Sequence, residues 1–469
     1  MNSTLRAAVA LFALAVASAQ SSPAGTTTPG PPTPATTPAT AEVGTLPGQV
    51  DALSLERAVE LALAGNEISG IATARLEGAS ALRRQAIAQL IPALTLTGNA
   101  TRRAREVTRT IDGDDVVVQA INAYSGQAAV DTPLFDLRAL PLIRAAGNGE
   151  AAQRIESDEL RRALAFDVAD GFYAVLSLEH LRDAARQRVA VGRQTVDESR
   201  IRLEAGLANR NDLTRTQLEL ASAELGATRA ANDVTTARLS LAYLINAPVD
   251  GALAVPERAA PPASGRQALV DAALRGRQEL VALDERVQQA KRLALAPRLG
   301  WVPRLDLRGI YRWTNEAGLS GNSTDWNIGA NLTWEVFDGG DRSALAAQRD
   351  ADAREVELLL LQRRRQVALD VDRATADLAT ADAALAQAQT QLDVARQNSE
   401  EVRERFQNGL ATALEQTDAQ VSAFEAESAV AQQGFARDVA GLALERALGS
   451  WPAGFAPNSS PTRSSEEAP

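Results

Sequence analysis

The longest regular pattern of apolar and polar positions in the chain runs through residues 341–408. This segment contains neither glycine nor proline, which cost ~1 and ~3 kcal/mol inside a helix, so it predicts one continuous helix. At a rise of ~1.5 Å per residue, that helix is roughly 100 Å long. Apolar residues recur in alternating steps of three and four, which predicts left-handed coiled-coil packing. The two rows are Val367, Ala374, Ala381, Ala388, Ala395 and Val402, and Val371, Leu378, Leu385, Leu392, Ser399 and Phe406.

A second pattern, with a period of two residues, occupies the segment just before this helix. One face carries Trp326, Ile328, Leu332, Trp334 and Val336, and the alternate positions are mostly polar. Residues 305–313 alternate in the same way and predict the neighbouring strand of an antiparallel pair. Two environments fit the alternation. It indicates either a strand that faces lipid, with aromatic residues near its ends, or a half-buried hairpin of a soluble protein.

The chain is predicted to contain two related halves, because short motifs return in the same order. Ala62-Leu63-Ala64-Gly65 returns as Ala273-Leu274-Arg275-Gly276, and the Pro-x-Leu-x-Leu-x-Gly segment at 92–98 returns at 303–309. Phe135-Asp136 returns as Phe337-Asp338, and Gly206-Leu207-Ala208 returns as Gly409-Leu410-Ala411. The spacing between counterparts shortens once, between Gly98 and Phe135, which indicates one loop of different length. We therefore predict a first structural repeat over 51–251, a linker over 252–265 and a second structural repeat over 266–450.

Each repeat has the same predicted elements: a helical stretch, a β-hairpin, a very long helix and a further helix. The two shorter helical stretches are each about 35 residues, or roughly 50 Å, so stacked end to end they match one long helix. Four glycines in the first long helix, at 147, 149, 171 and 192, predict a less regular helix than its counterpart in the second repeat.

The N-terminal residues have the pattern of a signal peptide. Arg6 supplies the positive charge, residues 7–16 the apolar stretch and Ala17-Ser18-Ala19 a cleavage site, which predicts a signal peptide over 1–19. Residues 20–50 are rich in proline and threonine and predict a disordered leader, and residues 451–469 predict a disordered tail. No other stretch approaches the ~20 apolar residues of a membrane-spanning helix, so any membrane crossing is expected to use the strands.

Composition argues against several other classes of protein. Of the 469 residues 45% are hydrophobic but only 4% are aromatic, which is typical of long helices with small-residue seams. The net charge of −11, with acids and bases interleaved, argues against nucleic acid as a partner. The chain has no cysteine and a single histidine, His180. We therefore expect no catalytic site, no metal site, no cofactor and no enzyme activity.

The recurring residues resemble those of the TolC-like outer-membrane efflux proteins, the outer membrane factor family. The resemblance covers about residues 53–449 and is carried by residues 55–58 and 62–66, the two Pro-x-Leu-x-Leu-x-Gly segments, residues 334–340 and the turns at 204–208 and 407–411. It implies an α+β membrane protein that forms a homotrimer. Twelve strands would form a transmembrane β-barrel in contact with outer-membrane lipid, continued into the periplasm by an α-helical coiled-coil tunnel.

The resemblance also implies a function and partners. The chain would be the outer-membrane channel-tunnel subunit of a tripartite efflux pump or a type I secretion system, exporting small molecules or proteins. Its partners would be a periplasmic adaptor (membrane fusion) protein and an inner-membrane transporter. The implied docking residues are the helix turns Gly206, Leu207, Ala208 and Gly409, Leu410, Ala411. An alternative function, an exported coiled-coil envelope spacer or stalk without a pore, fits the long helices taken alone.

Two acids lie where the closed entrance of the family is narrowed. Glu415 and Asp418 follow the second turn and are about one helical turn apart, so three chains would form a ring of carboxylates that favours cations. Two solvated acids on an exposed helix face fit the pattern equally well. The first repeat has Asp212 and Arg215 at the corresponding positions, which leaves open a clamp between Arg215 and these acids.

Overall fold

The computed structural model describes residues 52–111, 114–207, 209–256, 265–316, 322–452 and 455. The predicted signal peptide (1–19) and leader (20–50) lie outside these residues, as do residues 257–264 of the predicted linker. Ala208, in the first predicted docking turn, and most of the predicted tail (451–469) also lie outside them.

The described elements follow the same order in both halves of the chain. The first half contains α2 (Leu55–Gly65), α3 (Glu67–Ala88), β1 (Ala93–Arg102), β2 (Val107–Ile111), β3 (Asp114–Gln119), β4 (Asn122–Phe135), α4 (Ala139–Glu204) and α5 (Arg210–Ile245). The second contains α6 (Arg266–Gly276), α7 (Gln278–Leu299), β5 (Arg304–Thr314), β6 (Thr324–Thr333), α8 (Asp341–Gln407) and α9 (Ala413–Leu448). The β2–β3 hairpin lies between Gly98 and Phe135, where the sequence predicts a difference in loop length.

The two long helices are each continuous. α8 has 67 residues, in agreement with the absence of glycine and proline from 341–408. α4 has 66 residues and is also one helix, so the prediction of a less regular first long helix is wrong. Gly149, Gly171 and Gly192 lie where neighbouring helices approach closely, whereas a Cβ on Gly147 would have no contact within 4 Å. A Cβ on Gly149 would be 2.8 Å from Gln289 of α7, and one on Gly192 would be 3.4 Å from Leu220 of α5. These glycines therefore serve helix–helix packing, whose contacts offset their intrinsic cost.

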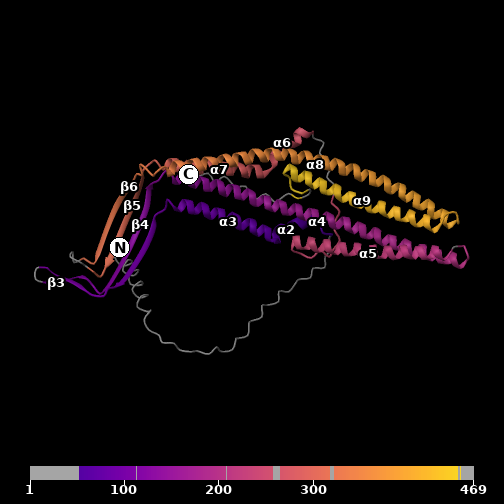
Figure 1. Cartoon of the computed structure of the whole chain (residues 1–469), viewed down its shortest axis with the longest axis horizontal. Helices are drawn as coiled ribbons and strands as arrows, with labels where there is room; N and C mark the ends of the chain where they lie inside the picture. The colour runs from indigo at the N-terminus through magenta and orange to yellow at the C-terminus, as the bar shows by residue number, and fades with distance from the viewer. Residues whose placement is uncertain are drawn as a thin grey trace, which may run out of the picture. The chain divides into compact units, whose positions relative to one another are not determined.

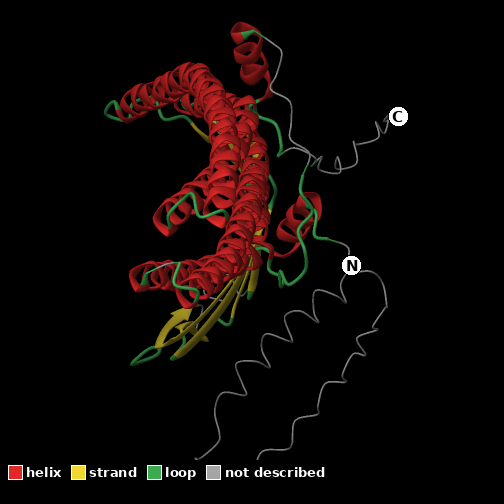
Figure 2. Cartoon of the chain, turned by 90° about the vertical axis from the view of Figure 1, so that its right-hand side faces the viewer, coloured by secondary structure: helices red, strands yellow, loops and turns green. Residues whose placement is uncertain are grey.

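The helices form a layer in which the long ones lie beside pairs of shorter ones (Figures 1 and 2). α4 packs against α3, α5, α7 and α9, and α8 packs against α7 and α9. α7 and α9 thus follow each other between the two long helices, and α3 and α5 follow each other along α4. This is the end-to-end stacking of short helices that their predicted lengths require.

The two stacking joints share one kind of hydrogen bond. Asn66, between α2 and α3, donates from Nδ2 to the carbonyl of Leu244 near the end of α5, at 2.9 Å. Arg277, between α6 and α7, donates from Nε to the carbonyl of Ala447 near the end of α9, at 2.7 Å. The last carbonyls of a helix lack intrahelical partners, so each joint satisfies one of them and fixes the short helices to each other.

Gly449 lies at the tightest point of the second joint. Its φ is 84°, in the left-handed region, and a Cβ there would lie 2.8 Å from the carbonyl carbon of Gly276. We expect Gly449→Ala to destabilise the protein by about 3 kcal/mol, because it adds both backbone strain and a clash. Gly409→Ala, at φ 74° but with no atom within 4 Å, should cost only ~1 kcal/mol. Thermal melting followed by circular dichroism measures both, and equal melting temperatures would contradict the prediction.

The four long strands form one antiparallel sheet in the order β1-β4-β5-β6, and β2 and β3 pair separately. In this sheet Leu96 lies opposite Ala128, Gly309 opposite Val130, and Ile328 opposite Gly309. The apolar positions of neighbouring strands therefore share one face. β1 and β6 each have one neighbour within the sheet, so among the described residues both outer edges lack a pairing partner.

The buried side chains form two clusters. The larger one joins α2, α4 and α5 around Phe166 and Phe172, and the smaller one joins α6, α7, α8 and α9 around Val367 and Val371. Both surround the stacking joints, at the middle of the long helices. No helix in the described part of the chain combines the length and the apolar character needed to cross a membrane.

Candidate functional site

The sheet has one apolar face that is exposed to solvent in the single chain. Trp326 and Leu332 of β6 are 69% and 66% exposed, and Ile328 is similar. The register continues this face through Tyr311 on β5, Val130 on β4 and Leu94 and Leu96 on β1. An uncovered apolar face of this extent is typical of a surface that meets lipid or another molecule.

Trp334 and Val336 lie beyond the strand to which the sequence assigned them. β6 ends at Thr333, whose partner on β5 is Arg304, the first residue of that strand. Trp334 donates from its indole Nε1 to the carbonyl of Trp301, at 3.1 Å. Both residues are exposed, and they lie on a segment without strand pairing.

The opposite face of the sheet is polar. Asn327 and Asn331 alternate with the apolar residues of β6, and Arg308 of β5 forms an ion pair with Asp131 of β4, from Nε to Oδ1 at 3.2 Å. One apolar and one polar face are the pattern that a strand between lipid and an aqueous channel requires.

At the other end of the helical layer, one turn joins α4 to α5 and another joins α8 to α9. The two turns have the same geometry. Gly206 and Gly409 have φ values of 71° and 74°. Leu207 donates its N–H to the carbonyl of Arg202 at 2.8 Å, and Leu410 donates to Arg405 at 2.7 Å. These bonds close the helix ends in the manner of a Schellman motif, which requires a left-handed residue that glycine adopts without strain. Each turn leaves a leucine exposed at its tip, Leu207 by 79% and Leu410 by 71%.

Glu415, predicted to line an entrance, belongs to the capping box of α9. Its carboxylate accepts the N–H of Thr412 at 2.7 Å and the Thr412 hydroxyl at 2.9 Å, while the Thr412 Oγ1 accepts the N–H of Glu415. These hydrogen bonds, above all the one from the Thr412 backbone, lower the pKa of Glu415. Asn209 and Asp212 form the same box at the start of α5, so the cap is duplicated.

Asp418 forms an ion pair between two helices instead of a helix cap. It is exposed, and its Oδ1 lies 3.8 Å from Nη2 of Arg215 on α5, so the Arg215 clamp that the sequence leaves open is present for this acid. An exposed pair at that distance contributes little stability, because water screens it. Both predicted entrance acids are thus exposed, but Glu415 is engaged in a cap and Asp418 is not.

Further contacts between the two helical hairpins were missed by sequence analysis. Arg202 of α4 donates to the carbonyl of Phe406 and lies over its ring, with 3.9 Å from Cζ to the centroid. Gln420 of α9 donates to the hydroxyl of Thr195 on α4, at 3.1 Å. Arg188 lies over the ring of Phe424, 4.7 Å from Cζ to the centroid. These contacts fasten the C-terminal part of α4 to α8 and α9, and no local motif marks them.

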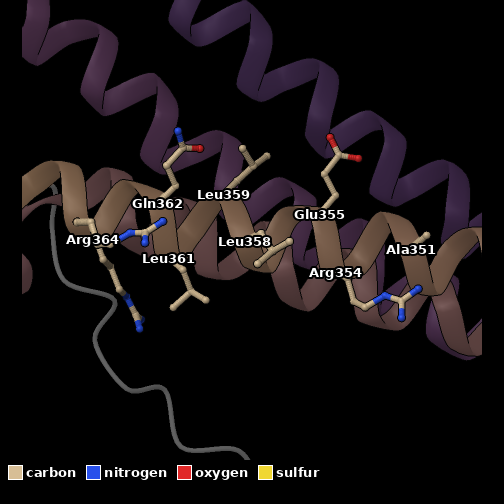
Figure 3. Close-up of a pocket in the computed structure, with 9 residues that line it drawn as sticks. Ala351, Arg354, Glu355, Leu358, Leu359, Leu361, Gln362 and Arg364 are labelled. Atoms are coloured by element: carbon tan, nitrogen blue, oxygen red, sulfur yellow. The ribbon is translucent and has the colours of Figure 1, made fainter.

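The outward side of α8 carries a shallow groove lined by nine residues (Figure 3). Leu358 and Leu361 project from the helix together with Arg354 and Arg364, and Leu358 is 65% exposed. Ala351 lies two turns before Leu358 on this side. The groove is part of a surface that no element of the described chain covers.

Comparison with known proteins agrees with this geometry. The family model for the outer membrane efflux protein matches residues 59–247 and 269–450. The pyoverdine export outer membrane protein OpmQ of Pseudomonas aeruginosa is 27% identical over 413 residues, covering 84% of this chain and 85% of the relative. Outer membrane protein OprJ of the same species is 26% identical over 432 residues, covering 85% and 84%.

Solved structures show the same fold. The outer membrane protein VceC of Vibrio cholerae aligns with a TM-score of 0.69 at 20% identity, covering 84% of this chain and 96% of that one. The CmeC outer membrane channel of Campylobacter jejuni aligns with a TM-score of 0.71 at 16% identity, covering 90% and 94%.

A helical layer that continues into an antiparallel sheet with one apolar face defines an outer-membrane channel-tunnel subunit with a periplasmic helical part. The chain belongs to the outer membrane efflux protein family. The resemblance drawn from the sequence, the α+β fold with two structural repeats, the efflux function and the outer-membrane location are thereby confirmed. The members of this family are channels; that this chain has no catalytic activity stays a prediction.

Proposed function

We propose that the chain works as a homotrimer whose twelve strands form one β-barrel and whose helices form one closed tunnel. The observation that carries this proposal is a second heptad row on α8, on the side opposite its contacts with α7 and α9. Val367, Val371 and Leu378 face those helices and are buried. The exposed row follows the same steps of three and four and consists of Ala344, Ala347, Ala351, Arg354, Leu358, Leu361 and Arg365. A helix with seams on opposite sides is suited to lie between two neighbours.

The free edge of the first half offers a matching surface. Gly70, Ala74, Gly78 and Ala81 follow one another along the exposed side of α3, and a Cβ added to either glycine would meet no other part of the described chain within 4 Å. Small residues let a partner helix approach closely, so the leucines of a neighbouring α8 would fit between them. On α5, Leu218, Leu225 and Leu239 are exposed at multiples of seven residues. The unpaired edges of β1 and β6 lie on these same two sides, which supports closure through copies of the chain.

Assembly should depend on Leu358. Aspartate at this position would place a charge without a partner in the proposed interface, so we expect Leu358→Asp to abolish most trimer formation while the single chain keeps its helical content. Chemical cross-linking and native electrophoresis of detergent extracts measure the trimer. Gln348→Asp, on an exposed position nearly three turns earlier, serves as the control. Trimers of Leu358→Asp in parental yield would overturn the proposed interface.

The partners follow from the proposed orientation. With the sheet in the outer membrane, the turns at Gly206-Leu207 and Gly409-Leu410-Ala411 lie at the periplasmic end, where their exposed leucines would dock a periplasmic adaptor protein and an inner-membrane transporter. A tripartite efflux pump and a type I secretion system both have this architecture. Trp326, Ile328 and Leu332 are proposed to face lipid, with Trp334 and Val336 at the inner boundary of the membrane.

Glu415 and Asp418 are proposed to lie at the tunnel entrance, and the capping box divides their roles. Asp418 would supply most of the cation preference, because the Glu415 carboxylate is already engaged by Thr412. In planar bilayers we expect Asp418→Asn to lower cation selectivity and block by multivalent cations, and Glu415→Gln to lower both much less. Arg215→Gln should increase cation selectivity, since it removes the opposing charge. Equal selectivity of the three variants and the parent would assign the acids to the solvated surface.

A further inference from the structure

The polar face of the sheet carries all of its arginines on one strand. Arg304, Arg308 and Arg312 are four residues apart on β5 and therefore lie on one face, at intervals of about 13 Å. The facing residues in the register are Thr333, Gly329 and Asp325 on β6. We call Arg304, Arg308 and Arg312 the arginine ladder. Strand residues on a lumen-facing surface determine what a barrel lets through, so the ladder has a direct relation to transport.

The carboxylates near the ladder leave part of each guanidinium available. Arg308 contacts Asp131 through Nε at 3.2 Å, and Arg304 contacts Asp306 through Nε at 3.1 Å. Arg312 donates from Nη2 to the amide oxygen of Gln127, at a long 3.5 Å. The terminal amino groups of Arg304 and Arg308 make no hydrogen bond within the described residues. Both side chains are about half exposed, so these groups face water.

The neighbouring acids balance the charge of the ladder without removing its binding capacity. Asp131, Asp306 and Asp325 share the polar face with the three arginines. The face thus repels cations less than three isolated arginines would, yet it presents pairs of N–H donors that match the two oxygens of a carboxylate. In a closed trimer the ladder would be present three times around one lumen, with its copies four strands, or roughly 19 Å, apart along the wall.

We propose that the arginine ladder is a carboxylate-binding relay in the barrel lumen, specific for solutes that carry two or more carboxylate groups. Such a solute binds one guanidinium through its terminal amino groups and transfers to the next, about 13 Å further along the strand. Each contact is weak because the lumen is hydrated, so a solute is held long enough to be guided but leaves quickly. The proposal rests on the trimeric barrel described above, with the polar face inside.

Citrate binding to purified trimers in detergent, measured by isothermal titration calorimetry, tests the relay. The parent should bind citrate, and R304Q/R308Q/R312Q should bind it at least about tenfold more weakly, since three charge-assisted donors are lost. R304K/R308K/R312K keeps the charge but loses the fork and should fall between the two. Arg102→Gln is the matched control, because Arg102 lies on β1 in register with the apolar face. Sulfate, a multivalent anion without carboxylates, should compete poorly with citrate.

Several results would overturn the relay. These are no citrate binding by parental trimers, equal binding by the parent and the triple glutamine variant, or an equal loss in Arg102→Gln. Sulfate that competes as well as citrate would reduce the ladder to a general anion site, which also contradicts the proposed specificity. If the triple variant fails to assemble, Arg308→Lys and Arg312→Gln trimers are measured instead and must each show weaker binding. A parent that forms no trimer would instead contradict the proposed assembly, so the two failures are distinguishable.

Discussion

Leu378→Asp is expected to prevent stable assembly of the protein. Leu378 is 6% exposed and belongs to the buried cluster between α6, α7, α8 and α9. Aspartate there would bury a carboxylate with no designed partner in an apolar seam, at a cost of several kcal/mol. The seam holds α8 to α9, so its loss separates the helices that the proposed tunnel needs. Heat-resistant trimers in detergent electrophoresis are the measurement.

Two further substitutions define how far this seam reaches. Leu392→Asp should have an effect close to that of Leu378→Asp, because Leu392 is also buried. Leu385→Asp should have a smaller effect, since Leu385 is only half-buried. Gln389→Asp, at an exposed position of the same helix, is the control and should assemble like the parent. Trimers of Leu378→Asp that resist heat as the parental trimers do would show that the seam is misplaced.

The long helices were predictable because their signals are local and repeated many times. Residues 341–408 contain no helix breaker, and the heptad rows through Val367 and Val371 coincide with buried or half-buried positions of α8. The prediction of a less regular α4 is wrong because contacts with neighbouring helices offset the low helix propensity of glycine. Gly149 packs against Gln289 and Gly192 packs against Leu220, so contacts with other helices decide why glycine is suited to these positions. Helix propensity alone does not carry that information.

The end of β6 was also not predictable from the pattern of apolar residues alone. The alternation of apolar residues continues through Trp334 and Val336, but a strand needs a hydrogen-bonding neighbour as well as a pattern. β5 begins at Arg304, directly after Pro303, which has no N–H to donate. The pairing therefore ends at Thr333. The proline was visible in the sequence, so this boundary could have been placed correctly.

The candidate entrance was predictable only in part. Thr412-Ala413-Leu414-Glu415 has the Thr-x-x-Glu spacing of a capping box, a local signal that explains Glu415 without any ring of charges. The pair of Arg202 and Phe406 has no such signal, because the two residues are far apart in the sequence. Contacts of this kind depend on which helices become neighbours, which only the folded structure defines.

Leu332→Arg is expected to impair insertion of the protein into the outer membrane. Leu332 lies on the apolar face of β6, beside Leu305 of β5 in the register, and is exposed in the single chain. Arginine facing lipid costs ~2–4 kcal/mol at the middle of the membrane and less toward its surface. Leu332 is not at mid-strand as the sequence pattern suggests but one residue before the end of β6, so its cost should lie below that maximum. Its neighbour Asn331 lies on the polar face, opposite Asp306. Arginine at Asn331 should therefore be tolerated, since water and the Asp306 carboxylate are both within its reach.

The two variants differ by one position along the strand, so they test which face of the sheet meets lipid rather than the effect of arginine on the strand. Each variant is expressed in a host with an outer membrane, and the membranes are isolated. The inserted fraction is the protein that resists extraction by urea but dissolves in detergent. The parent and Asn331→Arg should be mostly inserted, and Leu332→Arg mostly not. Ile328→Arg should have a stronger effect than Leu332→Arg, because Ile328 is at the middle of β6 and the cost of a charge decreases toward the membrane surface. Equal insertion of Leu332→Arg and Asn331→Arg would contradict the proposed lipid-facing surface, and with it the proposed polar lumen.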